Sequence, residues 1–186
     1  MSLRKRVISA AIVAATVAVL GSSASPASAR VSDGYVSGLG DFTNDWGDEG
    51  PLSTSSNATS NATCLWQQIL WAEGANEQNG SDFDASDIDG IFGADTRHAT
   101  MDLQRRWKLE DVDGIVGPDT FGYLDDRRLV HYSGSESGTL WMHYNGPTHH
   151  FYITRTSSGN YGFWEGSDND NGTTIRYASY KVRSCS

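Results

Sequence analysis

The feature that most constrains this chain is a short internal repeat. Asp89–Thr96 reads Asp-Gly-Ile-Phe-Gly-Ala-Asp-Thr, and it recurs 24 positions later as Asp113–Thr120, with six of the eight positions identical. Gly after Asp predicts a tight turn, because Gly tolerates a positive φ. We expect the apolar pair that follows to fill the core, and Asp or Thr to cap the next helix. The predicted structural turn residues are Asp89, Gly90, Gly93, Thr96, Asp113, Gly114, Gly117 and Thr120.

Three segments before, between and after the two repeated turns have apolar residues at helical spacing. A first amphipathic helix is expected from a Thr63 cap to a Gly74 stop, because apolar residues recur at helical spacing between them. A second helix is expected to open at Asp95 or Thr96. A third is expected to start at Pro118, a favourable first-turn residue, and to include Phe121, Leu124 and Leu129.

The last third of the chain has a different pattern. Four short aromatic and β-branched runs, separated by turn-forming clusters, predict a small antiparallel sheet over 140–144, 150–154, 161–164 and 174–177. Half of the residues of such a sheet face outward, so its aromatic side chains either form a carbohydrate-binding surface or pack on the helices. The aromatic residues in question are Trp141, Tyr144, Phe151, Tyr152, Tyr161, Trp164 and Tyr177.

The first 29 residues have the layout of a secretory signal peptide. Three basic residues precede an apolar run from Val7 to Leu20, and Ala27-Ser28-Ala29 predicts cleavage after Ala29. The run is shorter than the roughly 20 residues that a membrane-spanning helix needs. We therefore expect a secreted protein, extracellular or associated with the cell wall, with no membrane attachment after cleavage.

The charge of the chain excludes one class of partner, and its cysteine content predicts a disulfide. Of 14 basic and 23 acidic residues, three basic ones lie before the cleavage point, so the remaining chain has 11 and 23 and a net charge of −12. Such a chain has no broad basic field, and no nucleic-acid partner is expected. Cys64 and Cys185 are the two cysteines, and export to an oxidising compartment predicts that they pair.

The segment from Cys64 to Leu124 resembles the peptidoglycan-binding-like domain of bacterial cell-wall hydrolases and related secreted proteins. The family's opening Leu-Gln corresponds here to Trp66-Gln67, and its Phe-Gln to Leu103-Gln104. Its central Asp-Gly-x-Phe-Gly-x-x-Thr stands at 89–96, and its closing Asp-Gly-x-x-Gly-Pro-x-Thr stands at 113–120. Ala94 replaces a usual Pro. The resemblance covers about a third of the chain and implies a compact three-helix module.

The resemblance also implies a function and an organisation. It implies binding to cell-wall glycan or its peptide stems, with peptidoglycan or its fragments as partner. We expect no cofactor, and we expect the ligand in the groove beside the first and second helices, with contacts from Gln67, Phe92, Arg97, Gln104 and Arg105. The expected class is α+β, with an N-terminal three-helix peptidoglycan-binding-like bundle followed by a small antiparallel β region and tied to it by the disulfide. The expected divisions are a signal peptide at 1–29, a flexible Ser/Gly/Asn-rich lead-in at 30–62, the binding module at 63–130 and the β region at 131–186.

Two other functions stay open. A small wall hydrolase would use His143, His149 or His150 with Glu165, and Glu73 and Glu77 are further carboxylate candidates. Neighbouring positions of a strand face opposite sides, which argues against His149 and His150 binding one metal, and no metal site is expected. The same scaffold would also serve an interaction protein that binds another secreted protein, because fold does not determine ligand.

Overall fold

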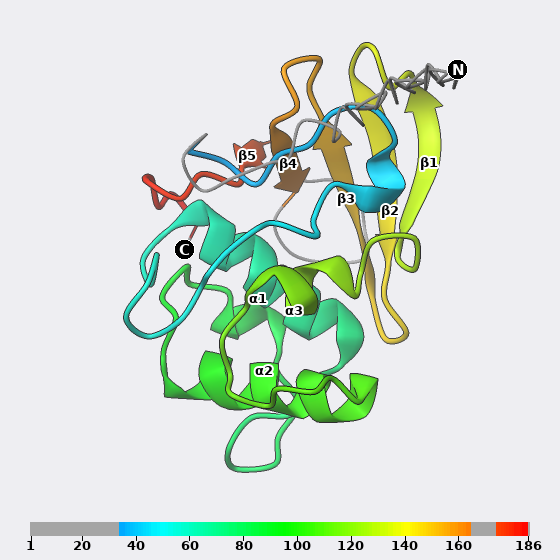
Figure 1. The fold of residues 1–186 in the computed structure, drawn as a ribbon. Helices are drawn as coiled ribbons and strands as arrows, with labels where there is room; N and C mark the ends of the chain where they lie inside the picture. Colours follow the sequence, from blue (N-terminus) through cyan, green and yellow to red (C-terminus); the bar gives the residue numbers. More distant parts are fainter. Residues whose placement is uncertain (1–33, 165–173, 186) are drawn as a thin grey trace, which may run out of the picture.

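The computed structural model describes residues 34–164 and 174–185, and the predicted signal peptide lies outside these residues. The fold is α+β, with helices followed by a five-stranded antiparallel sheet (Figure 1). Among the described residues, none of the helices is long and apolar enough to span a membrane. The elements in chain order are η2 (Phe42–Asn44), α1 (Asn61–Glu73), η3 (Ala85–Asp87), α2 (Ala94–Trp107), α3 (Pro118–Gly122), β1 (Leu129–Gly134), β2 (Leu140–Asn145), β3 (His150–Arg155), β4 (Tyr161–Trp164) and β5 (Ile175–Tyr177).

Helix α1 lies at the centre of the molecule. Its N-cap is Ser60, whose hydroxyl accepts a hydrogen bond from the Thr63 N–H, so the predicted Thr63 cap is three residues too late. Gly74 ends the helix in the left-handed conformation, as predicted. All thirteen residues of α1 are buried, which corrects the expected amphipathic helix. Figure 1 shows the reason: α1 lies between α2 on one side and the sheet on the other.

The other two helices follow the two repeated turns. Helix α2 starts at Ala94, one residue before the earlier of the two predicted positions. Helix α3 has five residues and ends at Gly122, so it does not reach Leu129. Leu129 instead begins β1, where its side chain is buried.

The sheet has the strand order β1-β2-β3-β4-β5, with every pair antiparallel. The four predicted runs correspond to β2 to β5. Strand β1 was not predicted, because only its first residue is buried and it lacks the alternation of a half-buried strand. It forms one edge of the sheet.

The segment expected to be a flexible lead-in is packed into the fold from residue 34 onward, which corrects that expectation. Val36, Trp46 and Leu52 are completely buried, and the segment crosses the sheet in Figure 1. Backbone hydrogen bonds link Val36 to Tyr161 and to Ala178. The buried side chains come singly in irregular backbone, so no period of 3.6 or 2 revealed them.

Two ion pairs, one buried and one partly buried, connect these parts. The guanidinium of Arg155, on β3, lies 2.5 Å from Asp45 Oδ2, and the Tyr161 hydroxyl donates to the same oxygen at 2.6 Å. Glu73, at the end of α1, accepts two hydrogen bonds from Arg128 and one from the Tyr144 hydroxyl at 2.8 Å. The first pair fixes the N-terminal segment to the sheet, and the second fixes α1 to the sheet.

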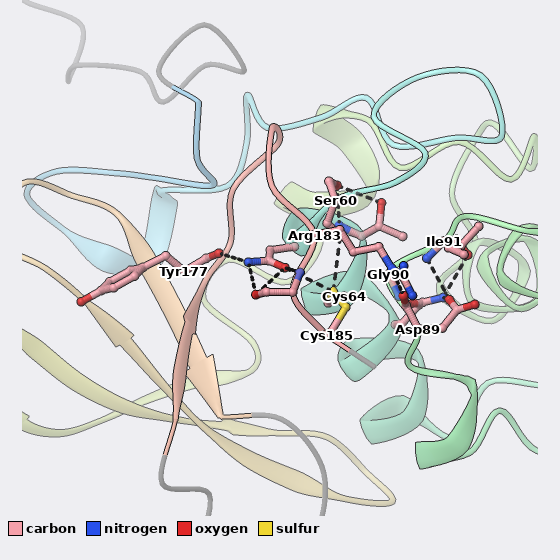
Figure 2. The surroundings of a disulfide bond; sticks show 12 residues. Ser60, Cys64, Asp89, Gly90, Ile91, Tyr177, Arg183 and Cys185 are labelled. Carbon is pink, nitrogen blue, oxygen red and sulfur yellow. Dashed lines mark hydrogen bonds between the residues drawn. A yellow bond between two sulfur atoms is a disulfide. The ribbon is translucent and has the colours of Figure 1, made fainter.

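The predicted disulfide between Cys64 and Cys185 is present and closes a span of 121 residues. Figure 2 shows it between the first turn of α1 and the C-terminal segment. The Arg183 side chain donates to the backbone oxygen of Asp89, and Ser60 N–H donates to Gly90 O. Gly90 has φ +71° and lies so close to both sulfur atoms that a Cβ there would collide with them. The disulfide therefore joins three segments: α1, the first repeated turn and the C-terminus.

We predict that Glu73→Ala lowers the free energy of unfolding by about 3 kcal/mol, because it leaves the buried Tyr144 hydroxyl and Arg128 without their acceptor. Urea denaturation at pH 7 measures this. The exposed carboxylate Glu110, changed to Ala, is the matched control and is expected to shift stability by less than about 0.5 kcal/mol. Equal effects of the two substitutions would contradict the assigned role of Glu73.

A second prediction concerns pH. Burial raises the pKa of Asp125 to about 6, and the nearby Asp45 carboxylate adds to the rise, although Asp125 accepts a hydrogen bond from Trp46 N–H. A carboxyl whose folded pKa lies above its unfolded value contributes stability that is fully present below about pH 4 and is lost as the pH rises through about 6. Because Asp125 is partly exposed, we expect this group to account for a loss of about 1 to 2 kcal/mol.

The substitution Asp125→Asn keeps an oxygen acceptor for Trp46. It is expected to make the protein more stable than wild type at pH 7 and equally stable at pH 4, by denaturation at both values. The exposed neighbour Asp126, changed to Asn, is the control. An unchanged pH profile in the Asp125 variant would refute the assignment.

Candidate functional site

The first repeated turn is closed by a glutamine from α1. The Gln67 carboxamide nitrogen donates to Asp89 Oδ1 at 2.9 Å, to Ile91 O at 3.1 Å and to Thr96 Oγ1 at 3.1 Å. Its oxygen accepts from Gly90 N–H at 2.6 Å. One side chain thus satisfies the polar groups inside the turn.

The second turn repeats this arrangement with a glutamine from α2. Gln104 donates to Asp113 Oδ1, Ile115 O and Thr120 Oγ1 at 3.1, 2.9 and 3.1 Å, and accepts from Gly114 N–H at 2.9 Å. In both turns the Asp carboxylate also accepts from the N–H two residues later, at 2.8 Å. The repeat in sequence is therefore also a repeat of hydrogen bonds.

These contacts change the roles expected of the two glutamines. Gln67 and Gln104 are each 1% exposed, and both atoms of each carboxamide are engaged within the turns. They were predicted to contact a ligand directly, and the structure places both carboxamides inside the turns, where they hold the backbone. Phe92, also predicted as a contact, is 2% exposed.

The apolar pair of each turn divides between core and surface. Phe92 and Val116 are buried as expected, but Ile91 and Ile115 are 43% and 40% exposed. Neighbouring residues of extended backbone point to opposite sides, so only one member of each pair reaches the core. The same rule, applied to the sequence, would have predicted that one member of each pair is exposed.

The predicted helix caps also differ. The N-caps of α2 and α3 are Gly93 and Gly117, with no side-chain cap hydrogen bond. Thr96 and Thr120 instead donate back to the carbonyls of Ile91 and Ile115 and receive the glutamine hydrogen bonds. The threonines therefore belong to the turns, because the glutamines occupy the inside of each turn.

Each turn borders a surface hollow, and the two hollows use equivalent positions. The hollow at α2 has a volume of about 180 Å³ and the hollow at α3 about 480 Å³. The positions common to both, named first for α2 and then for α3, are Gln67, Asp89, Ile91, Gly93, Ala94, Asp95 and Thr96, and Gln104, Asp113, Ile115, Gly117, Pro118, Asp119 and Thr120. Asp87 adds a carboxylate to the smaller hollow, and Glu110 and Asp111 add two to the larger one, beside Lys108.

Residues 64–124 match the family described as a putative peptidoglycan binding domain. The matched segment includes α1 from its fourth residue, both turns, α2 and α3. It contains both glutamines and the whole lining of both hollows. No curated protein and no solved structure matches the chain.

Two arginines of the matched segment were predicted to contact the ligand, and both are exposed on α2. The Arg97 guanidinium donates to Asp113 O at 3.0 Å, so it links the start of α2 to the second turn. Arg105 lies in the last turn of α2. The structure therefore keeps these two residues at the surface, while it buries the other three predicted contacts.

The histidines considered for catalysis lie in the sheet region and do not converge. His149 stacks on Trp71 of α1, with ring centroids 4.2 Å apart, whereas His150 lies beside His143 at 6.5 Å. His149 and His150 thus face opposite sides, as predicted. Among the described residues no group of three or more His, Cys, Asp or Glu side chains is placed to hold a metal. Glu165 lies outside the described residues.

The two other candidate carboxylates have internal partners. Glu73 is bound by Arg128 and Tyr144, and Glu77 accepts from the Ser81 hydroxyl at 2.9 Å. Both are buried. A buried, paired carboxylate at the end of α1 serves to join α1 to the sheet.

We predict that Gln104→Ala lowers the free energy of unfolding by about 3 kcal/mol, because Gly114 N–H and the acceptors of the turn lose their partner. Gln104→Glu is expected to be equally damaging at pH 7, since a carboxylate would face three oxygen atoms, and less damaging at pH 4, where a protonated carboxyl can donate. The exposed Gln78, changed to Ala, is the control. Denaturation at both pH values measures all three, and a stable Gln104→Ala protein would overturn the positioning role.

Proposed function

We propose that this protein is exported and binds cell-wall peptidoglycan through the two turn hollows, without a catalytic site of its own. The match of residues 64–124 to a peptidoglycan binding domain supports the partner. The observation that supports the location is the duplicated hollow, with an exposed isoleucine in each copy. On this view α1, α2 and α3 form the three-helix binding module.

Export rests on the signal pattern that ends at Ala29. The disulfide supports it, because such bonds persist mainly outside the reducing cytosol. Extracellular or wall-associated localisation follows from export together with the proposed partner.

The chemistry of the hollows suits a ligand rich in hydrogen-bond donors. The larger hollow combines the apolar Ile115 and Pro118 with the carboxylates of Asp113 and Asp119. Carboxylates accept hydrogen bonds from hydroxyl, amide and amino groups, all of which occur in a glycan with peptide stems. They repel polyanions, so we expect stronger binding to peptidoglycan stripped of anionic polymers than to intact walls.

The glutamines make such a surface possible. A side chain that projects from a loop binds with less entropic cost when the loop is already fixed. Gln67 and Gln104 fix the backbone on both sides of Ile91 and Ile115 from within. Each isoleucine is thereby presented on a rigid turn.

The test is sedimentation of residues 30–186 with purified, stripped peptidoglycan, with assay of the supernatant for released sugar and peptide. We expect binding without release. Ile91→Ser and Ile115→Ser are each expected to weaken binding by about three- to tenfold and together by more, because each removes an exposed apolar contact without disturbing the core.

Leu39→Ser is the matched control, since Leu39 is similarly exposed at 47% but lies outside the matched segment. Absence of protein from the pellet would refute wall binding. Release of fragments would refute the non-catalytic role, and equal effects of all three substitutions would refute the location.

A further inference from the structure

The outer face of the sheet is the side away from α1, and its described strand residues are aromatic, aliphatic or polar without a formal charge. The inner face is buried against α1 and the N-terminal segment. Strand register places alternate residues on the outer face. No Asp, Glu, Lys or Arg is found among the described strand residues of this face. Its members are Val130, Tyr132, Ser133, Trp141, His143, Asn145, His150, Tyr152, Thr154, Gly162, Trp164, Ile175 and Tyr177.

One aromatic ring from each of four strands forms a row across this face. Ring centroids are separated by 5.3 Å from Tyr132 to His143, by 4.1 Å from His143 to Tyr152, and by 6.1 Å from Tyr152 to Trp164. Trp141 lies 5.7 Å from Trp164 and widens the row. At about 4.8 Å between neighbouring strands the row is about 14 Å long, more than a single sugar ring spans.

Tyr132 lies at a β-bulge in β1. The register shifts between His131 and Ser133, which pair with Met142 and Trp141. Tyr132 is the extra residue, and its ring lies against His143 and Tyr152 on the outer face. Val130, the register partner of His143, lies on the same face, so alternation along β1 from Val130 also directs Tyr132 outward.

The face is accessible and has hydrogen-bonding groups. Tyr132 is 64% exposed and Tyr177 is 44% exposed, and Trp141 and Trp164 are partly exposed. The Nε2 atom of His143, at the centre of the row, is buried and has no hydrogen-bond partner within the described part of the chain. Tyr132 and Ser133 add exposed hydroxyl groups at the edge of the sheet.

The composition of the face identifies the chemistry of its partner. A sheet face that only meets water normally includes charged side chains, and the chain has 37 charged residues, but none of them is among the described strand residues of this face. A charged partner would meet no carboxylate, ammonium or guanidinium group on these strand residues. Aromatic rings with interspersed hydroxyl and imidazole groups complement a molecule that has C–H faces and many hydroxyls but no net charge.

We propose that the outer face of the sheet is a second binding surface, which takes an uncharged polysaccharide chain along the row from Tyr132 to Trp164. This surface lies outside the matched segment and does not depend on the turn hollows. A protein with both surfaces would hold a polymer at two points, and its overall affinity would exceed that of either surface alone.

The experiment is calorimetric titration of residues 30–186 with the hexamer of β-1,4-linked N-acetylglucosamine, a soluble uncharged sugar chain. We expect saturable binding. Trp164→Ala and Tyr132→Ala are each expected to raise Kd by about three- to tenfold, the loss of one aromatic contact, and Trp164→Phe is expected to recover most of the affinity. Thermal unfolding of each variant shows whether the fold is kept.

Two controls make the result specific. Tyr123→Ala removes an aromatic ring that stacks on Trp107 of α2, away from the sheet, and is expected to leave Kd unchanged. The Ile91→Ser, Ile115→Ser double variant is expected to bind the hexamer like wild type, so failure of this proposal and failure of the proposed function give different patterns. Absence of binding would overturn the proposal. The proposal would also fail if the wild-type protein is a dimer in solution and Trp164→Ala converts it to a monomer, because the outer face would then be an interface between two copies of the chain.

Discussion

The polar side chains of a helix that is buried on every side need hydrogen-bond partners inside the protein. Helix α1 is such a helix, and the rest of this structure depends on the partners that its polar side chains bind. Asn61 donates to Tyr177 O and accepts from Ser184 N–H, which fixes the C-terminal segment. Gln67 closes the first turn, and Glu73 binds Arg128 and Tyr144. An unpaired buried polar group costs about 1 to 3 kcal/mol, so each of these contacts specifies the position of a neighbouring segment.

This arrangement explains why the helices and the sheet form one unit. The buried apolar residues make up a single cluster that extends from Val36 to Cys185. The sheet alone is too small for a stable core, and the helical segment alone would expose the sheet-facing side of α1. The disulfide adds a covalent link at the same place, between the first turn of α1 and the C-terminus.

Much of the fold follows from local sequence signals. The Asp-Gly turns, the Gly74 stop, four of the five strands and the cysteine pair were all predicted, because each depends on the chemistry of a few neighbouring residues. The N-terminal segment and the total burial of α1 depend on contacts between distant segments, and no local period records them. The two glutamines were identified from the apolar-Gln pairs Trp66-Gln67 and Leu103-Gln104, but their hydrogen bonds inside the turns were not, because each joins a helix to a turn more than eight residues away.

The central claim is that buried glutamines fix two turns so that exposed isoleucines meet the wall. The most direct measurement is nuclear magnetic resonance of residues 30–186 during titration with soluble peptidoglycan fragments. The account predicts that the methyl signals of Ile91 and Ile115 shift with added fragment, while the side-chain amide signals of Gln67 and Gln104 stay protected from exchange throughout. Unchanged isoleucine signals, or glutamine amides that exchange freely, would contradict it.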